Sequence, residues 1–135
     1  MKKPVFALIL TGLLLTILSC TYEEGPAISL RTKTSRLAGE WVAEKIVEKY
    51  VTVPESDYKD YGYEFRKNGT YTKILNTVRE DGTWEFNEDK SQLLLTVTNS
   101  PTAEVWTIKR LTNSDLWWWR NIVDGIREEH FKVKK

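Results

Sequence analysis

The stretch that predicts the fold most clearly is YGYEFRKNGTY, residues 61–71. Aromatic residues alternate with other side chains before an Asn-Gly pair, and a further aromatic residue follows that pair. In a β-strand alternate side chains share one face, and Asn-Gly is a frequent turn between two antiparallel strands. The stretch is therefore predicted to form a β-hairpin.

The length of the loop decides which residues of this hairpin face each other. A two-residue turn would place Phe65 opposite Thr72, whereas a three-residue loop with Gly69 in the left-handed conformation would place Phe65 opposite Tyr71. We prefer the second register because register follows the buried face. That register puts Lys73 on the same face as the aromatic residues. The face then contains Tyr61, Tyr63, Phe65, Tyr71 and Leu75.

Short candidate strands continue on both sides of the hairpin. Upstream, residues 41–53 alternate with one slip in period and are rich in β-branched residues, which favours a strand with a bulge over a helix. Downstream, Asp81-Gly82 is expected to be a turn or a strand start, and Asp124-Gly125 a tight turn. The other candidate strands cover residues 83–86, 93–97, 105–111, 116–122 and 126–133.

About eight strands at hairpin spacing, with no convincing helix after the N-terminal segment, indicate an all-β domain. We expect a small antiparallel up-and-down β-barrel or a small sandwich. Closure into a barrel would remove the exposed strand edges that invite aggregation.

The run Trp117-Trp118-Trp119 is the most unusual feature of these strands. Alternation places Trp118 on one face and its two neighbours on the other. One set should lie in the core, and the other must either be covered or form an exposed aromatic patch. We expect coverage, because tryptophan normally buries a large area.

The N-terminal segment has the layout of a secretory signal. Lys2 and Lys3 precede an apolar run over residues 5–18, which is too short for a comfortable membrane span. The following residues, Ile17 to Cys20, resemble the lipobox of bacterial lipoproteins. That resemblance implies that Cys20 is acylated, by palmitate among other chains, and becomes the mature N-terminus at the outer membrane.

Behind Cys20, the pair Glu23-Glu24 resembles the surface-export signal of Bacteroidetes lipoproteins, although an ordinary solvated linker explains it equally well. Residues 25–36 lack apolar periodicity and contain Gly, Pro, Ser and Thr, as expected of a spacer. The predicted organisation is thus a lipoprotein signal peptide over 1–19, a lipidated N-terminus and flexible spacer over 20–36, and a barrel domain over 37–135.

Composition excludes several classes of function. The formal net charge is +1, and loss of the two lysines in the signal leaves −1, so we expect no binding to nucleic acid. Cys20 is the sole cysteine and His130 the sole histidine, which speaks against a disulfide or a metal site; His130 is expected to be surface-exposed. No nucleophile elbow or phosphate-binding loop is present. We expect a protein without cofactors that is not an enzyme.

Four stretches resemble the lipocalin-like domains of Bacteroidetes lipoproteins. They are Gly39-Glu40-Trp41, Phe65 to Tyr71, Gly82-Thr83-Trp84, and Trp106 to Leu111 followed by Leu116. The resemblance implies that Trp41 plugs one barrel end. It also implies an arginine stacked on that tryptophan, for which Arg120 and Arg127 are the candidates.

Two functions fit this reading. In the first, the barrel binds a small hydrophobic ligand in an apolar pocket of at least about 300 Å³. Its lining would be Tyr63, Phe65, Tyr71, Trp84, Trp106 and Trp118. In the alternative, the barrel is filled, and Trp117 and Trp119 on its outer face bind a glycan or a partner protein. The oligomeric state is not predicted.

Overall fold

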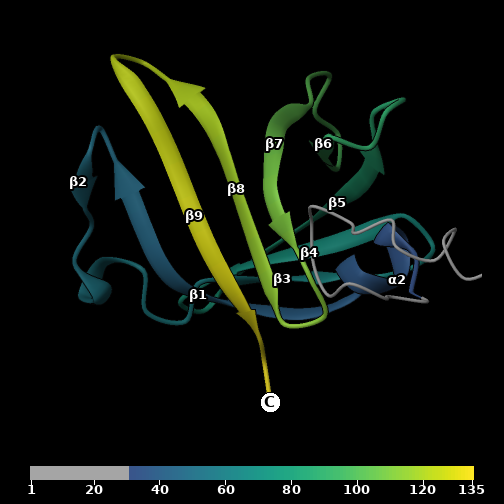
Figure 1. The fold of residues 1–135 in the computed structure, drawn as a ribbon, viewed down its shortest axis with the longest axis horizontal. Helices are drawn as coiled ribbons and strands as arrows, with labels where there is room; N and C mark the ends of the chain where they lie inside the picture. The colour runs from purple at the N-terminus through teal and green to yellow at the C-terminus, as the bar shows by residue number, and fades with distance from the viewer. Residues whose placement is uncertain (1–30) are drawn as a thin grey trace, which may run out of the picture.

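The computed structural model describes residues 31–135. The predicted signal peptide, Cys20 and the acidic pair behind it lie outside the described residues. Figure 1 shows a single antiparallel sheet that curls around on itself, with α2 beside one end. No helix within residues 31–135 has the length and apolar character needed to cross a membrane.

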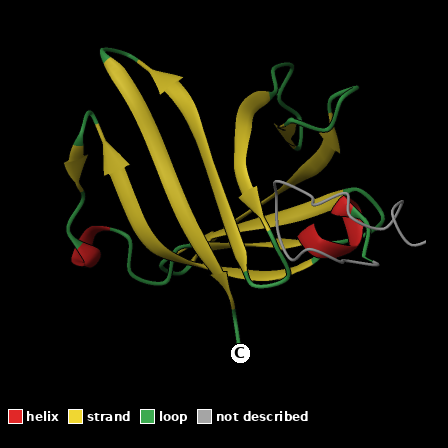
Figure 2. Ribbon diagram, in the orientation of Figure 1, coloured by secondary structure: helices red, strands yellow, loops and turns green. Residues whose placement is uncertain are grey.

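Helical residues are few in the described part of the chain, as Figure 2 shows. They form α2 (Lys33–Leu37) and the 3-10 helix η2 (Glu55–Asp57). The strands are β1 (Gly39–Glu48), β2 (Val51–Thr52), β3 (Gly62–Phe65), β4 (Thr70–Leu75), β5 (Val78–Phe86), β6 (Gln92–Val97), β7 (Glu104–Leu111), β8 (Asp115–Ile122) and β9 (Gly125–Val133).

The sheet closes because β9 pairs antiparallel with β1. Within residues 31–135, β1 and β3 to β9 form an eight-stranded up-and-down barrel, and the two residues of β2 pair only with the end of β1. The predicted all-β barrel of about eight strands is confirmed. Closure satisfies the backbone groups that a sheet edge would leave unpaired.

The hairpin over residues 61–71 has the predicted register. Phe65 lies opposite Tyr71, and residues 67–69 form the loop with Gly69 at φ 86°. Lys73 stays on the inner face, because β4 pairs with both neighbours without a bulge. The predicted slip upstream is also present: the β1–β9 register shifts between Ala43 and Lys45.

One turn prediction is wrong. Asp81 and Gly82 are neither a turn nor a strand start, because β5 begins at Val78 and runs through both. Gly82 instead allows β5 to pack closely against its neighbouring strands. A Cβ atom there would overlap the carbonyl oxygen of Thr96 and approach the Tyr71 ring to 2.6 Å.

Helix α2 covers one end of the barrel. Thr32 caps the helix by accepting a hydrogen bond from the Ser35 N–H at 3.1 Å. Arg36 donates to the Leu111 carbonyl at 3.0 Å, and Leu37 is fully buried. Residues 33–36 thus pack with the barrel, although their composition is that of a spacer. Trp41, the residue implied to plug an end, is buried here and donates its indole N–H to the Leu37 carbonyl at 2.7 Å.

The core of the barrel is largely aromatic. Trp118 is fully buried, and its ring stacks on that of Trp106 with centroids 4.8 Å apart. Trp117 and Trp119 point to the outer face and are half-buried. The aromatic rings in contact around Trp118 include Tyr63, Phe65, Trp106 and Phe131.

Candidate functional site

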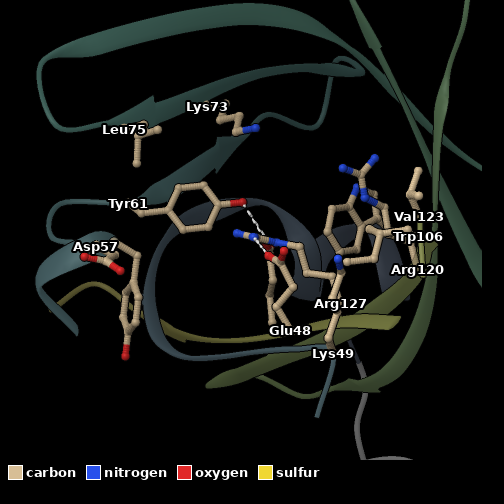
Figure 3. A pocket seen from close by; sticks show the side chains of 13 residues that line it. Glu48, Lys49, Asp57, Tyr61, Lys73, Leu75, Trp106, Arg120, Val123 and Arg127 are labelled. Carbon is tan, nitrogen blue, oxygen red and sulfur yellow. Dashed lines mark hydrogen bonds and ion pairs between the residues drawn. The ribbon is translucent and has the colours of Figure 1, made fainter. Parts of the chain in front are cut away.

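A cavity of about 540 Å³ lies at the barrel end opposite α2, among the tips of the β1–β2, β4–β5 and β8–β9 hairpins (Figure 3). Its volume exceeds the 300 Å³ predicted, but its lining is not the apolar one predicted. Seven of the lining residues carry ionisable acidic or basic groups: Glu48, Lys49, Asp57, Lys73, Arg120, Arg127 and Glu129. Aromatic and aliphatic residues complete the wall: Tyr58, Tyr61, Leu75, Trp106, Ile122 and Val123.

Glu129 forms the floor of this cavity and is only 1 % exposed. Its carboxylate accepts hydrogen bonds from the Tyr61 hydroxyl at 2.9 Å, from the Trp118 indole at 2.9 Å and from the Arg127 Nε at 2.7 Å. Arg127 also pairs with Glu48 through Nη1 at 2.6 Å. A buried carboxylate is tolerated only when it is paired and hydrogen-bonded in this way.

This network shifts the ionisation of its members. Burial by itself would lower the pKa of Arg127, but the Glu129 carboxylate raises it above the ordinary value of arginine. Burial, and then the charge of Glu129, raises the pKa of Tyr61 well above its usual value. Tyr61 therefore stays protonated and keeps donating to Glu129 at neutral pH.

Arg120 forms part of the opposite wall. Its guanidinium carbon lies 4.9 Å from the centre of the Trp106 ring, and its Nη1 lies 3.1 Å from Glu104. The Nε of Arg120 is buried without a hydrogen-bond partner among residues 31–135. Neither predicted candidate stacks on Trp41, since Arg120 covers Trp106 and Arg127 binds two carboxylates.

Lys73 reaches into the cavity from the middle of β4. Its ammonium group lies 5.8 Å from the centre of the Tyr61 ring and, within the described residues, makes no ion pair with a carboxylate. Glu80 lies directly opposite Lys73 in the sheet but is exposed. Lys73 is thus the half-buried cation of this wall that lacks a carboxylate partner.

The six residues predicted to bind a ligand lie in one core, but only Trp106 lines this cavity. Tyr63 lines a second, smaller hollow of about 250 Å³ beside Trp41 and Gly62. The rings of the set mostly contact one another; Tyr63 and Phe65, for example, stack at 5.4 Å. The remaining members, Tyr71, Trp84 and Trp118, are buried among these rings.

Sequence reasoning missed the polar residues that shape the site, although a signal for them existed. Alternation along β9 places Arg127 and Glu129 on the same face as Phe131, which is a core position. That pattern predicts a charged pair inside the barrel. The partner hydroxyl of Tyr61 is 68 residues away, so no local pattern could have shown it.

On the outer face, His130 is half-buried rather than surface-exposed as predicted. Its ring stacks on Trp117 with centroids 4.3 Å apart, and its Nε2 lies 2.6 Å from Glu128. Arg110 covers the Trp117 ring at 5.0 Å. Within residues 31–135, no group of three or more His, Cys, Asp or Glu residues could hold a metal ion.

Comparisons with known proteins place these features in a family context. A family model described as lipocalin-like domain matches residues 37–118. A lipocalin-like protein from Bacteroides uniformis shares the fold with a TM-score of 0.58 and 13 % identity, covering 73 % of this chain and 99 % of that one. A duf4847 family protein from Bacteroides vulgatus matches with a TM-score of 0.53 and 12 % identity over 73 % and 94 % of the chains. A search of curated proteins finds no match.

Proposed function

This chain belongs to the lipocalin-like domain family, and from that premise we propose that its barrel binds a small hydrophobic ligand in the cavity at the end opposite α2. The observation that carries the proposal is the cavity itself. A volume of about 540 Å³ falls in the range of small-molecule sites, and the wall combines six aromatic or aliphatic residues with seven acidic or basic ones.

The lining suits a ligand that has an apolar part. Trp106 and Tyr61 supply aromatic surface, and Leu75, Ile122 and Val123 supply aliphatic surface near the rim. Burying these surfaces against a ligand would contribute roughly 25 cal/mol per Å² of apolar area. The proposed activity is binding, with no catalytic step.

The experiment compares two variants that add the same bulky side chain at opposite ends of the barrel. Ile122→Trp narrows the cavity, whereas Val133→Trp enlarges an exposed residue at the far end of β9. We expect the neutral fluorescent probe N-phenylnaphthylamine to bind the natural protein and Val133→Trp but not Ile122→Trp. Equal binding by both variants would place the probe elsewhere, and no binding by any protein would refute the proposal.

We further propose that the barrel is carried as an outer-membrane lipoprotein, anchored through acylated Cys20. The lipobox-like residues 17–20 support this. Several acyl chains give durable anchoring where one chain does not. Cys20→Ala should abolish labelling by a palmitate analogue in cells, and persistent labelling would contradict the anchor.

The alternative function uses the outer face, where Trp117 and Trp119 remain half-buried. A glycan or a partner protein could pack on these rings. The indole N–H of Trp117 is buried without a partner within residues 31–135, and Arg110 and His130 already cover the ring. Because the Trp117 ring is already covered on the outer face, we favour the cavity.

A further inference from the structure

We infer that the ligand of this cavity carries an anionic head group, a carboxylate in the simplest case, and that Lys73 and Arg120 receive it. The inference rests on the proposed function, because it names the chemistry of the ligand at the same site. It follows from how charge is paired, residue by residue, along the cavity wall.

Two of the four cations that line the cavity, Arg120 and Arg127, already have a carboxylate partner. Arg127 is bound on two sides, at 2.7 Å by Glu129 and at 2.6 Å by Glu48. Its charge is therefore satisfied within the protein, and the buried Glu129 carboxylate is satisfied with it. A ligand charge placed on the floor of the cavity would disturb a complete network.

Lys73 differs from Arg127 in this respect. It is half-buried on the inner face of β4, lies against the Tyr61 ring, and forms no ion pair within residues 31–135. Glu80, its cross-strand neighbour, shares its face of the sheet but is exposed, and no ion pair joins the two within residues 31–135. A partly desolvated ammonium group that holds no carboxylate in an ion pair gains from an anion placed beside it.

Arg120 supplies the second contact. One terminal nitrogen is held by Glu104, and Trp106 supports the guanidinium plane from below, so the group is fixed in position. The side chain is half-buried and lines the cavity, so its charge is partly desolvated there. A partly desolvated guanidinium gains from a further anionic acceptor, and a carboxylate is the strongest that a small organic ligand offers.

Lys73 and Arg120 line the same cavity. Figure 3 shows Lys73 from β4 near the Tyr61 ring and Arg120 from β8 beside Trp106, on the facing side of the same cavity. Leu75 and Val123 line the same cavity toward the hairpin tips. A ligand held in this way places its head between the two cations and its apolar part along the aromatic wall.

The test measures binding of decanoate, decanol and decylamine by isothermal titration calorimetry, below their aggregation concentrations. These ligands share a chain and differ in head-group charge. We expect decanoate to bind about ten-fold or more tightly than decanol, and decylamine to bind most weakly. Raising the salt concentration should weaken the binding of decanoate and leave the binding of decanol unchanged.

Single substitutions test whether Lys73 and Arg120 cause the preference for decanoate. Lys73→Met should weaken the binding of decanoate about ten-fold and change the affinity for decanol by less than about two-fold. Lys67→Met, in the exposed β3–β4 loop at the other end of the barrel, is the matched control and should change neither. Circular dichroism and thermal melting of each variant check that the fold is retained. Arg120→Gln provides a second, independent loss of the charged contact.

The outcomes separate the two proposals. Equal affinity for decanoate and decanol, or preference for decylamine, would overturn the anionic head group while leaving ligand binding intact. If Lys73→Met lowered the affinities for decanoate and decanol equally, the inference would also be overturned, because Lys73 would then contribute to the shape of the cavity and not through its charge. No binding of any of the three would overturn the inference together with the proposed function.

Discussion

At the scale of single residues, Glu129 is the group whose surroundings matter most. Its carboxylate is buried, and it links Tyr61 of the segment before β3, Trp118 of β8 and Arg127 of β9. The buried charge is costly alone and acceptable with these partners. The same three contacts set the floor of the cavity, so stability and site geometry depend on one residue.

Glu129→Gln should therefore lower the free energy of unfolding by about 2–4 kcal/mol, because it removes the charge that pairs with Arg127 and weakens two further hydrogen bonds. Urea denaturation followed by tryptophan fluorescence measures the change. Glu85→Gln, at an exposed position of β5, is the control and should stay within about 0.5 kcal/mol. A loss in Glu129→Gln as small as in the control would show that the network is not stabilising.

The buried tyrosines predict a decline of stability in alkali. Burial raises the pKa of Tyr63 well above its usual value and, with help from Glu80 and Glu104, raises the pKa of Tyr71 to about 12. An unfolded chain releases phenolic protons from about pH 10, whereas the folded state holds them. Unfolding then releases protons. The free energy of unfolding therefore keeps its full value below about pH 10 and decreases as the pH rises further.

Urea titrations between about pH 8 and pH 11 test this dependence. The matched variant is Tyr71→Phe, which keeps the ring in the core and removes one titrating hydroxyl. Its stability should fall less steeply above about pH 10 than that of the natural protein. Identical slopes would contradict the role of Tyr71.

At the scale of elements, the strands follow side-chain alternation, and their ends follow turn chemistry. The exception is β5, where Asp81-Gly82, expected to be a turn or a strand start, lies within a continuous strand. Glycine there makes room for the Tyr71 ring and the Thr96 carbonyl, so that β5 can lie tightly between β4 and β6. The tight fit at Gly82 explains why a turn signal appears inside a continuous strand.

Gly82→Ala should destabilise the barrel by about 1–3 kcal/mol, because the added methyl group forces β5 away from its neighbours. Thr83→Ala, one residue on and exposed, is the matched control and should cost much less. Thermal unfolding followed by circular dichroism compares the two. Equal melting temperatures would show that the barrel absorbs the methyl group without strain.

At the scale of the whole molecule, the two ends of the barrel differ. One end is sealed by α2, with Leu37 fully buried and Trp41 bonded to its carbonyl. The other end holds the charged cavity, and several apolar side chains at its hairpin tips are exposed, including Tyr50, Val78 and Val123. An eight-stranded barrel is just wide enough for side chains to fill it, and here aromatic rings fill the middle while the larger cavity lies at the end that carries the charged residues.

Leu37→Ala should lower the free energy of unfolding by about 2–5 kcal/mol, since it leaves a cavity under α2. Leu75→Ala at the other end, where the residue is 41 % exposed, should cost far less. Urea denaturation of both variants measures this asymmetry. Similar costs would mean that the two ends are equally packed.

Much of the architecture could be predicted from local patterns. Alternating aromatic residues and an Asn-Gly turn predict the central hairpin and its register, because side-chain period and turn geometry are set by neighbouring residues. Alternation also separates Trp118 from its two neighbours, although it leaves open which of the two sets lies inside. The four short stretches around Trp41, Phe65, Trp84 and Trp106 also predict the family that the family model shows.

Only the tertiary structure decided where the cavity lies and what lines it. The contact of Tyr61 with Glu129 joins residues 68 positions apart, and the Lys73 and Arg120 wall combines β4 with β8. These juxtapositions depend on the closure of β9 onto β1, which brings distant inner faces together. Local alternation determines which way a side chain points, but closure of the barrel determines which side chain it meets.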